Sequence, residues 1–417
     1  MENADIKKQI KHLYLSDQIS REALSGLEAI YLDICGEELD VSNFINAEKE
    51  ENKDLVFYGP KDTYLQKVRE NKPLITVIIP TYNYCHKICK CIDSVLMQDY
   101  GNIEILVMDD CSTDNTPEVI ADRYKEEHRV RYVRNEKNLG PGQNEHKAYN
   151  MANGEYIVII GHDDYYFEPA FFTKAVALLY EYPSLSMVCA NSVIYDIVKK
   201  TLLLEPVSFC GVMKGSRFFM GFRTKYRKPN STFPVVFRKA ALDKADFSHM
   251  RMMNDTSIYF RASLVGDVCM IRDWVGVYLQ HTSNISKSLP HGFILQNLDE
   301  KINIYHLAKG QIQGDSDEWL YDQLMDTIRF YLRSKPIELP KMLSLLLWIC
   351  KNGGNIKKRL TEEVLNCYYT STIKTSHAAK KLSGGVRCFR DHGVGYTFRR
   401  ALYHVGLWKD EEKSKGA

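Results

Sequence analysis

Leu74–Asn83 reads LITVIIPTYN, and this stretch indicates the class of fold. A short run of β-branched and aliphatic residues ends in Pro-Thr-Tyr-Asn, which is typical of a buried strand followed by a turn. Four similar runs follow, and segments with helical spacing separate them. The runs are Ile103–Asp110, Val130–Arg134, Tyr156–Gly161 and Leu185–Ala190, and the helical segments are Ile88–Gln98, Thr116–Glu127, Gln143–Asn153 and Pro169–Tyr182. This alternation predicts an α/β fold with a mostly parallel sheet flanked by helices.

The sequence on both sides of this region has a helical character. Residues 1–70 are polar with apolar residues three and four apart, which predicts a helical extension that packs on the main domain or on a partner. The charged stretch Ala47–Lys53 is expected to be a linker. Residues 71–290 form the predicted sheet domain, and residues 291–417 form a predicted helical C-terminal region. Within that region Met342–Cys350 is apolar all round and is expected to be buried.

The composition excludes several classes of protein. The 417 residues include 55 basic and 53 acidic ones, a net charge of +2, which argues against a protein that coats nucleic acid. The longest apolar run, Met342–Cys350, is about half of the ~20 residues that a membrane span needs. The first residues lack the apolar core of a secretory signal. Eleven cysteines at irregular spacing indicate reduced thiols, so we expect a cytoplasmic protein. From the balanced charge we expect no nucleic-acid partner.

Acidic and aromatic residues follow three of the predicted strands. Tyr82 follows the first strand, Asp109-Asp110 ends the second, and Asp163-Asp164 follows the fourth. Ligands bind at the carboxyl ends of the strands in parallel sheets, so we expect these side chains to lie together in a binding crevice. Crowding these carboxylates at one edge is costly unless cations or hydrogen-bond donors compensate their charge.

Carboxylates at such an edge suit a nucleotide diphosphate. One carboxylate can accept hydrogen bonds from a base or a ribose, and another can hold a divalent metal whose other ligands are phosphate oxygens. A dinucleotide-binding loop is disfavoured, because Gly140-Pro141-Gly142 lacks the third glycine of that motif, and a Walker loop is absent from the sequence. For Asp114 we expect the simpler role of a helix cap.

Four motifs in this region resemble those of the family 2 glycosyltransferases with the GT-A fold. They are Leu74–Asn83, Met108–Thr116 (MDDCSTDNT), Asn138–Gly142 (NLGPG) and Asn153–Pro169 (NGEYIVIIGHDDYYFEP). The resemblance extends from about Pro73 to Ser288. It implies the GT-A fold and the inverting transfer of a sugar from a nucleotide diphosphate donor, as in enzymes of bacterial surface-polysaccharide assembly.

The resemblance also implies roles for residues at the matching positions. Pro80, Tyr82, Asp110 and Asp163 would bind the nucleotide. Tyr82 would flank the base, Asp110 would hydrogen-bond it, usually as uracil, and Asp163 would contact the ribose or the donor sugar. Asp164 would ligate Mg²⁺ or Mn²⁺.

One histidine also matches the family's pattern, and the chain differs from that pattern at two places. His281 lies in Leu279–Ser286, which resembles the segment that closes the family's active site, and it would ligate the metal or contact the pyrophosphate. Gly161 stands where many members have a further aspartate. Asn144-Glu145-His146 stands where many members have an arginine, so we assign Asn144 only a supporting role.

Asn254-Asp255, followed by Arg261, resembles the segment that carries the family's catalytic base. Inverting transfer is a single displacement in which a carboxylate takes the proton of the acceptor hydroxyl, and Asp255 would be this base. Asp255 could also cap the predicted helix Thr256–Leu264, and the two roles are compatible. Arg261 would support Asp255 or the helix, and the segment Phe209–Ser231 would contact the acceptor.

Two further patterns have simple interpretations. Cys85, Cys89 and Cys91 lie near His86, but their spacing is not that of a zinc pair, and we interpret them as residues packed on a helix. The tail Ala378–Lys409 is basic with interleaved aromatic residues. It fits either an anionic membrane surface or packing of its aromatic side on the sheet domain.

We therefore predict a glycosyltransferase that moves a hexose or an N-acetylhexosamine from a nucleotide sugar, with UDP favoured, to a glycan or a lipid-linked glycan. A divalent metal would be its cofactor. We expect it in the cytoplasm, peripheral at the inner face of the plasma membrane if its tail binds there, and the N-terminal extension could form a homodimer. Two alternatives stay open. Gly161 and Asn254 would suit a non-catalytic nucleotide-sugar-binding scaffold subunit, and a nucleotidyltransferase would need more basic residues after Asn83.

Overall fold

The computed structural model describes residues 3–16, 18–39, 41, 59–222, 224–250, 252–282, 284, 290–311, 314–334 and 337–368. The expected linker at Ala47–Lys53 and the basic tail Ala378–Lys409 lie outside these residues. The chain divides into two compact units. The first contains the residues up to Ser286 and Asn303–Gly314, and the second contains Lys287–Ile302 and the residues from Asp315 onward.

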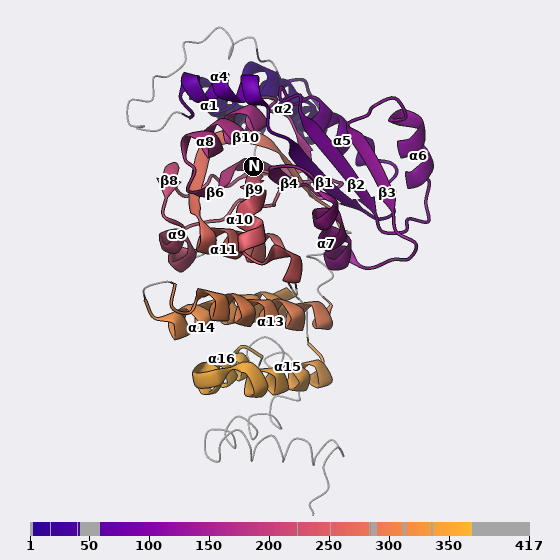
Figure 1. The fold of residues 1–417 in the computed structure, drawn as a ribbon. Helices are drawn as coiled ribbons and strands as arrows, with labels where there is room; N and C mark the ends of the chain where they lie inside the picture. Colours follow the sequence, from indigo (N-terminus) through magenta and orange to yellow (C-terminus); the bar gives the residue numbers. More distant parts are fainter. Residues whose placement is uncertain are drawn as a thin grey trace, which may run out of the picture. The chain divides into compact units, whose positions relative to one another are not determined.

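A ten-stranded sheet forms the first unit's core, in the order β3-β2-β1-β4-β9-β6-β10-β5, with β7 beside β6 and β8 beside β10 (Figure 1). The strands are β1 (Ile75–Thr81), β2 (Ile103–Asp109), β3 (Val130–Arg134), β4 (Tyr156–Ile159), β5 (Tyr165–Tyr166), β6 (Leu185–Asp196), β7 (Thr201–Leu204), β8 (Gly211–Met213), β9 (Val235–Arg238) and β10 (Asp267–Gln280). The five predicted runs are all strands of this sheet.

The direction of the strands confirms the α/β fold. Strand β1 is parallel to β2 and β4, β2 is parallel to β3, and β6 is parallel to β10. Strand β9 is antiparallel to both β4 and β6, so β6 again runs in the direction of β4. The carboxyl ends of β1, β2 and β4 therefore meet at one edge, as the sequence predicts.

Helices cover the sheet, and four of them are the helices predicted between the strands. These are α5 (Ile88–Leu96), α6 (Thr116–Arg123), α7 (Pro141–Met151) and α8 (Phe171–Glu181). The first unit also contains α1 (Asn3–Leu15), α2 (Arg21–Cys35), α4 (Asp62–Asn71), α9 (Gly215–Gly221), α10 (Lys239–Lys244), the 3-10 turn η1 (Phe247–His249) and α11 (Asp255–Val265). One core packs the apolar faces of α5 and α8 against β1, β2 and β4.

The N-terminal helices α1 and α2 share a second apolar core with the sheet. In it Leu27 and Tyr31 are buried together with Tyr165 of β5 and Trp274 of β10. The Trp274 backbone N–H donates a hydrogen bond of 2.9 Å to the Gln18 carbonyl. The extension thus packs on the main domain, which is one of the two arrangements expected from the sequence.

The second unit is helical, as predicted. Its elements are the first part of α13 (His291–Ala308), then α14 (Ser316–Ser334), α15 (Leu339–Asn352), the 3-10 turn η2 (Gly354–Ile356) and α16 (Lys357–Tyr368). The expectation that Met342–Cys350 is buried all round is wrong. Met342, Leu345 and Ile349 are buried, but Leu347 is 52% exposed, because the period of α15 carries it to the opposite face.

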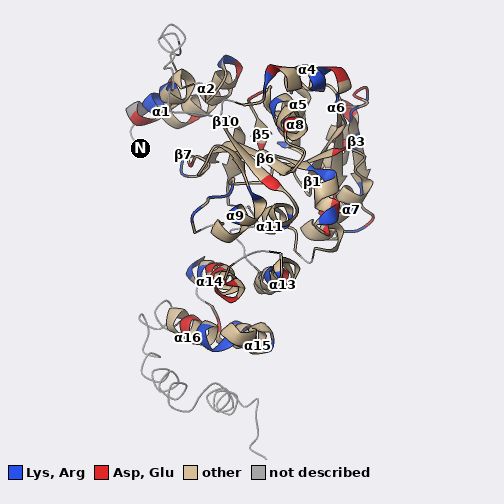
Figure 2. Ribbon diagram, turned by 60° about the vertical axis from the view of Figure 1, so that its left-hand side comes forward, with Lys and Arg blue, Asp and Glu red and all other residues tan. Residues whose placement is uncertain are grey.

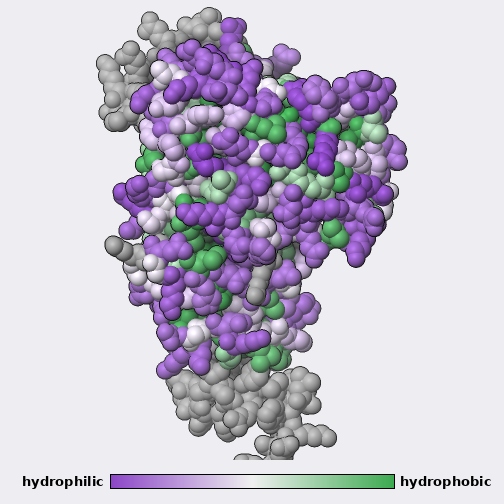
Figure 3. Space-filling model, in the orientation of Figure 1, coloured by the Kyte–Doolittle hydropathy of each residue, from purple (hydrophilic) through white to green (hydrophobic). Residues whose placement is uncertain are grey.

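Within the described residues, no helix has both the length and the apolar character required to cross a membrane. The face of the molecule in Figure 3 is largely hydrophilic, and its apolar residues occur in small scattered groups.

Candidate active site

Strand β1 ends in a loop that the end of β2 holds in place. The Asn83 N–H donates to Ser112 Oγ over 2.9 Å, and the Thr113 N–H donates to Asn83 Oδ1 over 2.7 Å. Asn83 has φ 53°, a left-handed conformation that asparagine tolerates better than most residues. Pro80 is half-buried at the end of β1, and Tyr82 is 44% exposed beside this loop. The ring of Tyr82 is therefore accessible to a ligand.

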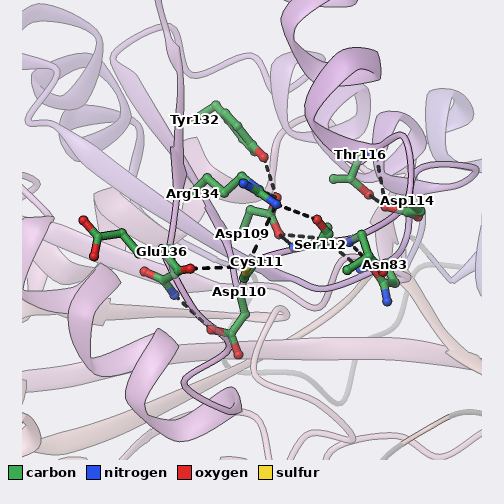
Figure 4. Close-up of polar contacts among 12 residues, drawn as sticks. Asn83, Asp109, Asp110, Cys111, Ser112, Asp114, Thr116, Tyr132, Arg134 and Glu136 are labelled. Carbon is green, nitrogen blue, oxygen red and sulfur yellow. Dashed lines mark hydrogen bonds and ion pairs between the residues drawn. The ribbon is translucent and has the colours of Figure 1, made fainter.

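The two aspartates at the end of β2 have different environments. Asp109 is fully buried, and its carboxylate accepts hydrogen bonds from Tyr132 and from Ser112, whose Oγ lies 2.6 Å away. The Asp110 carboxylate points to the other side of the strand (Figure 4). Asp109 thus joins β2 to β3 and to the following turn. The expectation that both members of this pair point into the crevice is wrong, because successive side chains of a strand alternate between its faces.

Asp110 holds the loop Asn138–Gly142. Its Oδ1 accepts a hydrogen bond from the Leu139 N–H at 2.7 Å, and its Oδ2 accepts one from the Gly140 N–H at 2.8 Å. The amide of Asn135 donates a third, at 3.0 Å. Asp110 is only 4% exposed, so these donors compensate the charge of a buried carboxylate.

Asn144 extends this network beneath the loop. Its Oδ1 accepts a hydrogen bond of 2.8 Å from Asn135, and its Nδ2 donates one of 2.8 Å to the Met108 carbonyl. Asn144 is buried, so the structure places it as a support for Asp110.

Asp163 and Asp164 follow β4 and lie against Gly161. A Cβ atom at position 161 would lie 2.7 Å from Asp163 Oδ1 and 3.5 Å from Asp164 Oδ2. The Asp163 carboxylate thus occupies the space beside Gly161. Glycine at position 161 thus permits this placement of Asp163, because a side chain at position 161 would displace the Asp163 carboxylate.

Asp164 is a buried carboxylate with two donors. The Leu279 N–H donates to its Oδ1 over 3.0 Å, and Ser231 Oγ donates to its Oδ2 over 3.2 Å. Burial, followed by the negative charge of Asp163, raises the pKa of Asp164 well above its ordinary value. A positive charge at this place would favour the ionised form.

His281 contacts the other carboxylate of this pair. Its Nε2 lies 2.9 Å from Asp163 Oδ2 and 3.3 Å from the hydroxyl of Tyr84. The Tyr84 ring in turn stacks on His162, with 4.0 Å between the ring centroids. The structure thus brings together Asp163, Asp164 and His281, as the sequence predicts, and pairs the histidine with Asp163.

The sequence analysis missed Tyr84 and His162 in this cluster. Burial and the charges of Asp163 and Asp164 raise the pKa of Tyr84 to about 12, so its phenol stays protonated. Burial lowers the pKa of His162, so its imidazole stays neutral. His162 stands within the motif Asn153–Pro169, and Tyr84 directly follows the motif Leu74–Asn83. An aromatic ring three positions after the last residue of each strand is the signal that could have identified them.

Asp255 forms an ion pair with Lys228, a second residue that the sequence analysis missed. The Asp255 side chain is 29% exposed, and its Oδ1 accepts a hydrogen bond of 2.6 Å from the Thr256 N–H. The residue that caps α11 is Asn254, whose Oδ1 accepts from the Ser257 N–H at 2.9 Å. The expected capping role of Asp255 is therefore wrong, because Asn254 occupies the cap position.

The segment Lys228–Ser231 connects the two groups of carboxylates. Lys228 binds Asp255, and Ser231 binds Asp164, so a stretch of four residues contacts both. The Cα atoms of Lys228 and Ser231 are three positions apart and lie at most ~11 Å from each other, so one short segment contacts both Asp255 and Asp164. Tyr259 of α11 fixes this segment, since its hydroxyl donates a hydrogen bond of 2.5 Å to the Ser231 carbonyl.

Arg261 lies behind the site. It is buried, and its guanidinium donates to the carbonyls of Ala245 and Asp246 over 2.8 and 3.1 Å. These carbonyls belong to the turn after α10, which leads through η1 to α11. Arg261 therefore anchors α11, which begins at Asp255, to the turn after α10.

The structure also places the residues of two minor motifs. Asp114 accepts hydrogen bonds from the Thr116 N–H and the Cys85 N–H, both at 3.1 Å. The cap position of α6 is occupied by Asn115, so Asp114 binds the first N–H of the helix without being its cap residue, and the expected capping role is met only in part. Cys91 is buried, and no group of three or more His, Cys, Asp or Glu residues in the described ranges is arranged to hold a metal on its own. Cys89 and Cys91 lie on α5, whereas Cys85 precedes this helix.

Comparison with known proteins places this site in context. The family model described as "Glycosyl transferase family 2" matches residues 76–249. Uncharacterized glycosyltransferase MG025 of Mycoplasma genitalium is 34% identical over 215 residues, which are 50% of this chain and 68% of that protein. Glycosyltransferase GlyG of Streptococcus pneumoniae is 38% identical over 91 residues, 22% of this chain and 30% of GlyG. The chain thus matches less than a third of the length of GlyG.

The fold has relatives among solved structures. The structure of S. aureus TarS 1-349 in complex with UDP-GlcNAc superimposes with a TM-score of 0.53. The sequence identity is 17%, and the match covers 80% of this chain and 92% of that one. At this identity the likeness shows a shared fold alone.

Proposed function

The chain belongs to glycosyltransferase family 2, and from this we propose that it transfers a sugar from a nucleotide diphosphate donor to a hydroxyl of a glycan or a lipid-linked glycan, with inversion at the anomeric carbon. The observation that carries the proposal is the convergence of three carboxylates at one edge of the sheet. Asp110 follows β2 and Asp164 follows β4, the two strands on either side of β1, and the segment Lys228–Ser231 contacts both Asp164 and Asp255.

Tyr82 and Asp110 would bind the base. Tyr82 offers an exposed ring for stacking, and Pro80 lies two residues before it on the same strand end. Asp110 accepts three hydrogen bonds, and a carboxylate offers about four lone-pair positions, so one position is left for a base N–H. UDP is our favoured donor nucleotide, and TarS, which shares the fold, binds UDP-GlcNAc.

Asp163 and Asp164 would hold a divalent cation, with His281 beside Asp163. The donor set suits Mg²⁺ or Mn²⁺, because such ions are bound by one or two carboxylates together with water and substrate phosphates. A bound cation would also offset the burial and the negative charge of Asp163, which together raise the pKa of Asp164. It would supply neutralisation of the charge that develops on the departing diphosphate.

Asp255 would act as the base. Its carboxylate is partly exposed and is not used as the helix cap, so one oxygen can take the proton of the acceptor hydroxyl. Lys228 holds this carboxylate in place, and the segment Phe209–Ser231 that contains Lys228 would line the acceptor side.

Nucleotide-dependent unfolding of the purified chain tests the donor site. We expect UDP to raise the midpoint of thermal unfolding in the presence of Mn²⁺ and to lose this effect with a chelator. A ligand at 100 times its Kd stabilises by about 2.7 kcal/mol. If no nucleotide diphosphate changes the midpoint, the donor site is refuted.

The variant Asp255→Asn tests the base. We expect transfer to fall by about 10²–10⁴-fold while the rise in midpoint with UDP is retained. Asp267→Asn is the matched control, since it breaks another Lys–Asp pair of the same unit, that of Lys214 with Asp267, whose atoms lie 2.9 Å apart. Transfer by Asp255→Asn at the rate of the unmodified chain would exclude Asp255 as the base. Binding of UDP-sugars without transfer to any of a broad set of acceptors would instead support a scaffold subunit.

A further inference from the structure

The segment Phe209–Ser231 is strongly basic in a chain that is almost neutral overall. It contains no Asp or Glu, and its basic residues are Lys214, Arg217, Arg223, Lys225, Arg227 and Lys228. The net charge of the whole chain is only +2, so this segment holds a concentration of positive charge. Basic positions are seen along the ribbon beside α9 in Figure 2.

Within the described residues, only part of this positive charge is paired with carboxylates of the protein. Lys214 pairs with Asp267, and Lys228 pairs with Asp255. Lys225 and Arg227 are exposed, and no carboxylate of the described residues forms an ion pair with either side chain. These two side chains, one to three positions before Lys228, are available to an external anion.

The location of this charge relates it to the acceptor. Lys228 contacts the carboxylate of Asp255, so the basic segment reaches the proposed base itself. An anionic acceptor group would be repelled by Asp255, and by Asp163 and Asp164 nearby, unless cations lie between them. Lys228 has the position to offset this repulsion.

We propose that the acceptor is anionic, and that Lys225, Arg227 and Lys228 bind its phosphate or carboxylate groups next to Asp255. The inference rests on the proposed function and names the class of its acceptor. Arg217 belongs to the same surface, since its Nε donates a hydrogen bond of 2.9 Å to the Tyr226 hydroxyl, which holds the guanidinium beside the segment.

Binding of three matched probes to the full chain tests this proposal. The probes are oligomers of similar length: a glycerol phosphate oligomer, a uronic-acid-containing oligosaccharide and a neutral glucose oligosaccharide. We expect at least one anionic probe to bind about tenfold or more tighter than the neutral one. The preference should fade between about 0.1 M and about 1 M salt, as the Debye length falls from ~10 to ~3 Å. The two anionic probes distinguish phosphate from carboxylate as the recognised group.

The double variant Lys225→Gln/Arg227→Gln should weaken binding of the preferred anionic probe by about five- to tenfold and leave that of the neutral probe unchanged. The matched control is Lys125→Gln/Arg131→Gln, which removes the same two charges from exposed positions outside the segment and should change neither. A third variant, Lys228→Gln, should raise the KM for an anionic acceptor more than that for a neutral one, and Lys228→Arg should restore the difference.

Equal binding of neutral and anionic probes, or equal losses in the double variant and its control, would overturn the proposal. So would a loss of binding to anionic lipid vesicles in the double variant with glycan binding retained, because the segment would then be a membrane surface. The UDP experiment distinguishes a failure of the proposed acceptor class from a failure of the proposed transferase function. If UDP stabilises the chain and the anionic preference is absent, the acceptor class is wrong while the transferase function stands.

Discussion

Asp110 shows how a single residue can serve both the fold and the ligand. Its carboxylate is nearly buried and holds the Leu139 and Gly140 N–H groups of the loop Asn138–Gly142. A carboxylate is suited to this role because it accepts several hydrogen bonds and donates none. A contact with a donor base at this residue would therefore depend on a loop that the same residue keeps in place.

Asp114 gives a pH dependence whose sign follows from its contacts. Burial raises its pKa, but hydrogen bonds from Thr116 and Cys85 outweigh burial and lower it from 3.8 to about 2. A group whose pKa is lowered by folding stabilises the fold above its unfolded pKa, and that contribution is lost as the pH falls toward its folded pKa. Asp114→Asn should thus lower the unfolding midpoint near pH 6, by about 2 °C for ~1 kcal/mol.

The difference between the unmodified chain and Asp114→Asn should shrink as the pH falls from about 4 toward about 2, the interval that the two pKa values enclose. Thermal unfolding at a series of pH values measures it. A difference that stays constant down to the lowest accessible pH would show that the ionised carboxylate of Asp114 contributes nothing.

At the scale of elements, the backbone of α2 packs closely against Phe167 beside the sheet. A Cβ atom at Gly26 would lie 2.4 Å from the Cβ of Phe167. Cβ atoms in proteins essentially never come closer than 3.0 Å to such a neighbour. Phe167 and Leu279 belong to the same apolar core, and the Leu279 N–H donates to Asp164. The packing of α2 is therefore connected to the backbone that positions an active-site carboxylate.

Gly26→Ala should destabilise the protein even though alanine favours helices by ~1 kcal/mol over glycine. Overpacking costs ~1–3 kcal/mol, so we expect a net loss of ~1 kcal/mol and a midpoint lower by about 2–4 °C. Gly142→Ala in α7 is the matched control, because nothing lies within 4 Å of a Cβ there, and it should not lower the midpoint. A higher midpoint for Gly26→Ala would show that α2 has room to move away from Phe167.

The elements that the sequence predicts well are those whose own residues determine them. The run LITVIIPTYN and the four later runs are short and rich in β-branched residues, and all five are strands in the structure. Strand β10 was missed because Arg272-Asp273 interrupts its apolar pattern, and the register of its pairing with β6 shifts at that point. Strand β9 has only four residues and depends on both of its neighbours in the sheet.

In the candidate site, too, some features follow from the local sequence and others depend on contacts between distant residues. The placement of Asp110, Asp163 and Asp164 follows from their position after parallel strands. The pairing of Lys228 with Asp255 spans 27 positions, which include β9 and α10, and no local pattern encodes it. The cap at Asn254 could have been predicted, since asparagine favours the cap position as much as aspartate does, and the choice between the two adjacent residues depends on where the helix begins.

For the whole molecule, the division into two compact units has a thermodynamic consequence. All of the proposed site residues belong to the first unit. A ligand stabilises only the cooperative unit that binds it, and compact units of a chain commonly unfold separately. We therefore expect calorimetry to show two transitions, of which UDP with Mn²⁺ raises one.

The other transition can be identified by a substitution in the second unit. The Trp348 indole N–H of α15 donates a hydrogen bond of 2.7 Å to the carboxylate of Asp299 in α13. Trp348→Phe keeps most of the apolar packing but leaves this carboxylate without its indole donor, at a cost of ~1–3 kcal/mol. Trp348→Phe should lower the midpoint temperature of the transition that UDP does not affect. It should leave unchanged the rise in midpoint that UDP causes in the other transition. A single transition that both UDP and Trp348→Phe displace would show that the two units unfold as one, and the helical unit would then contribute directly to the stability of the donor site.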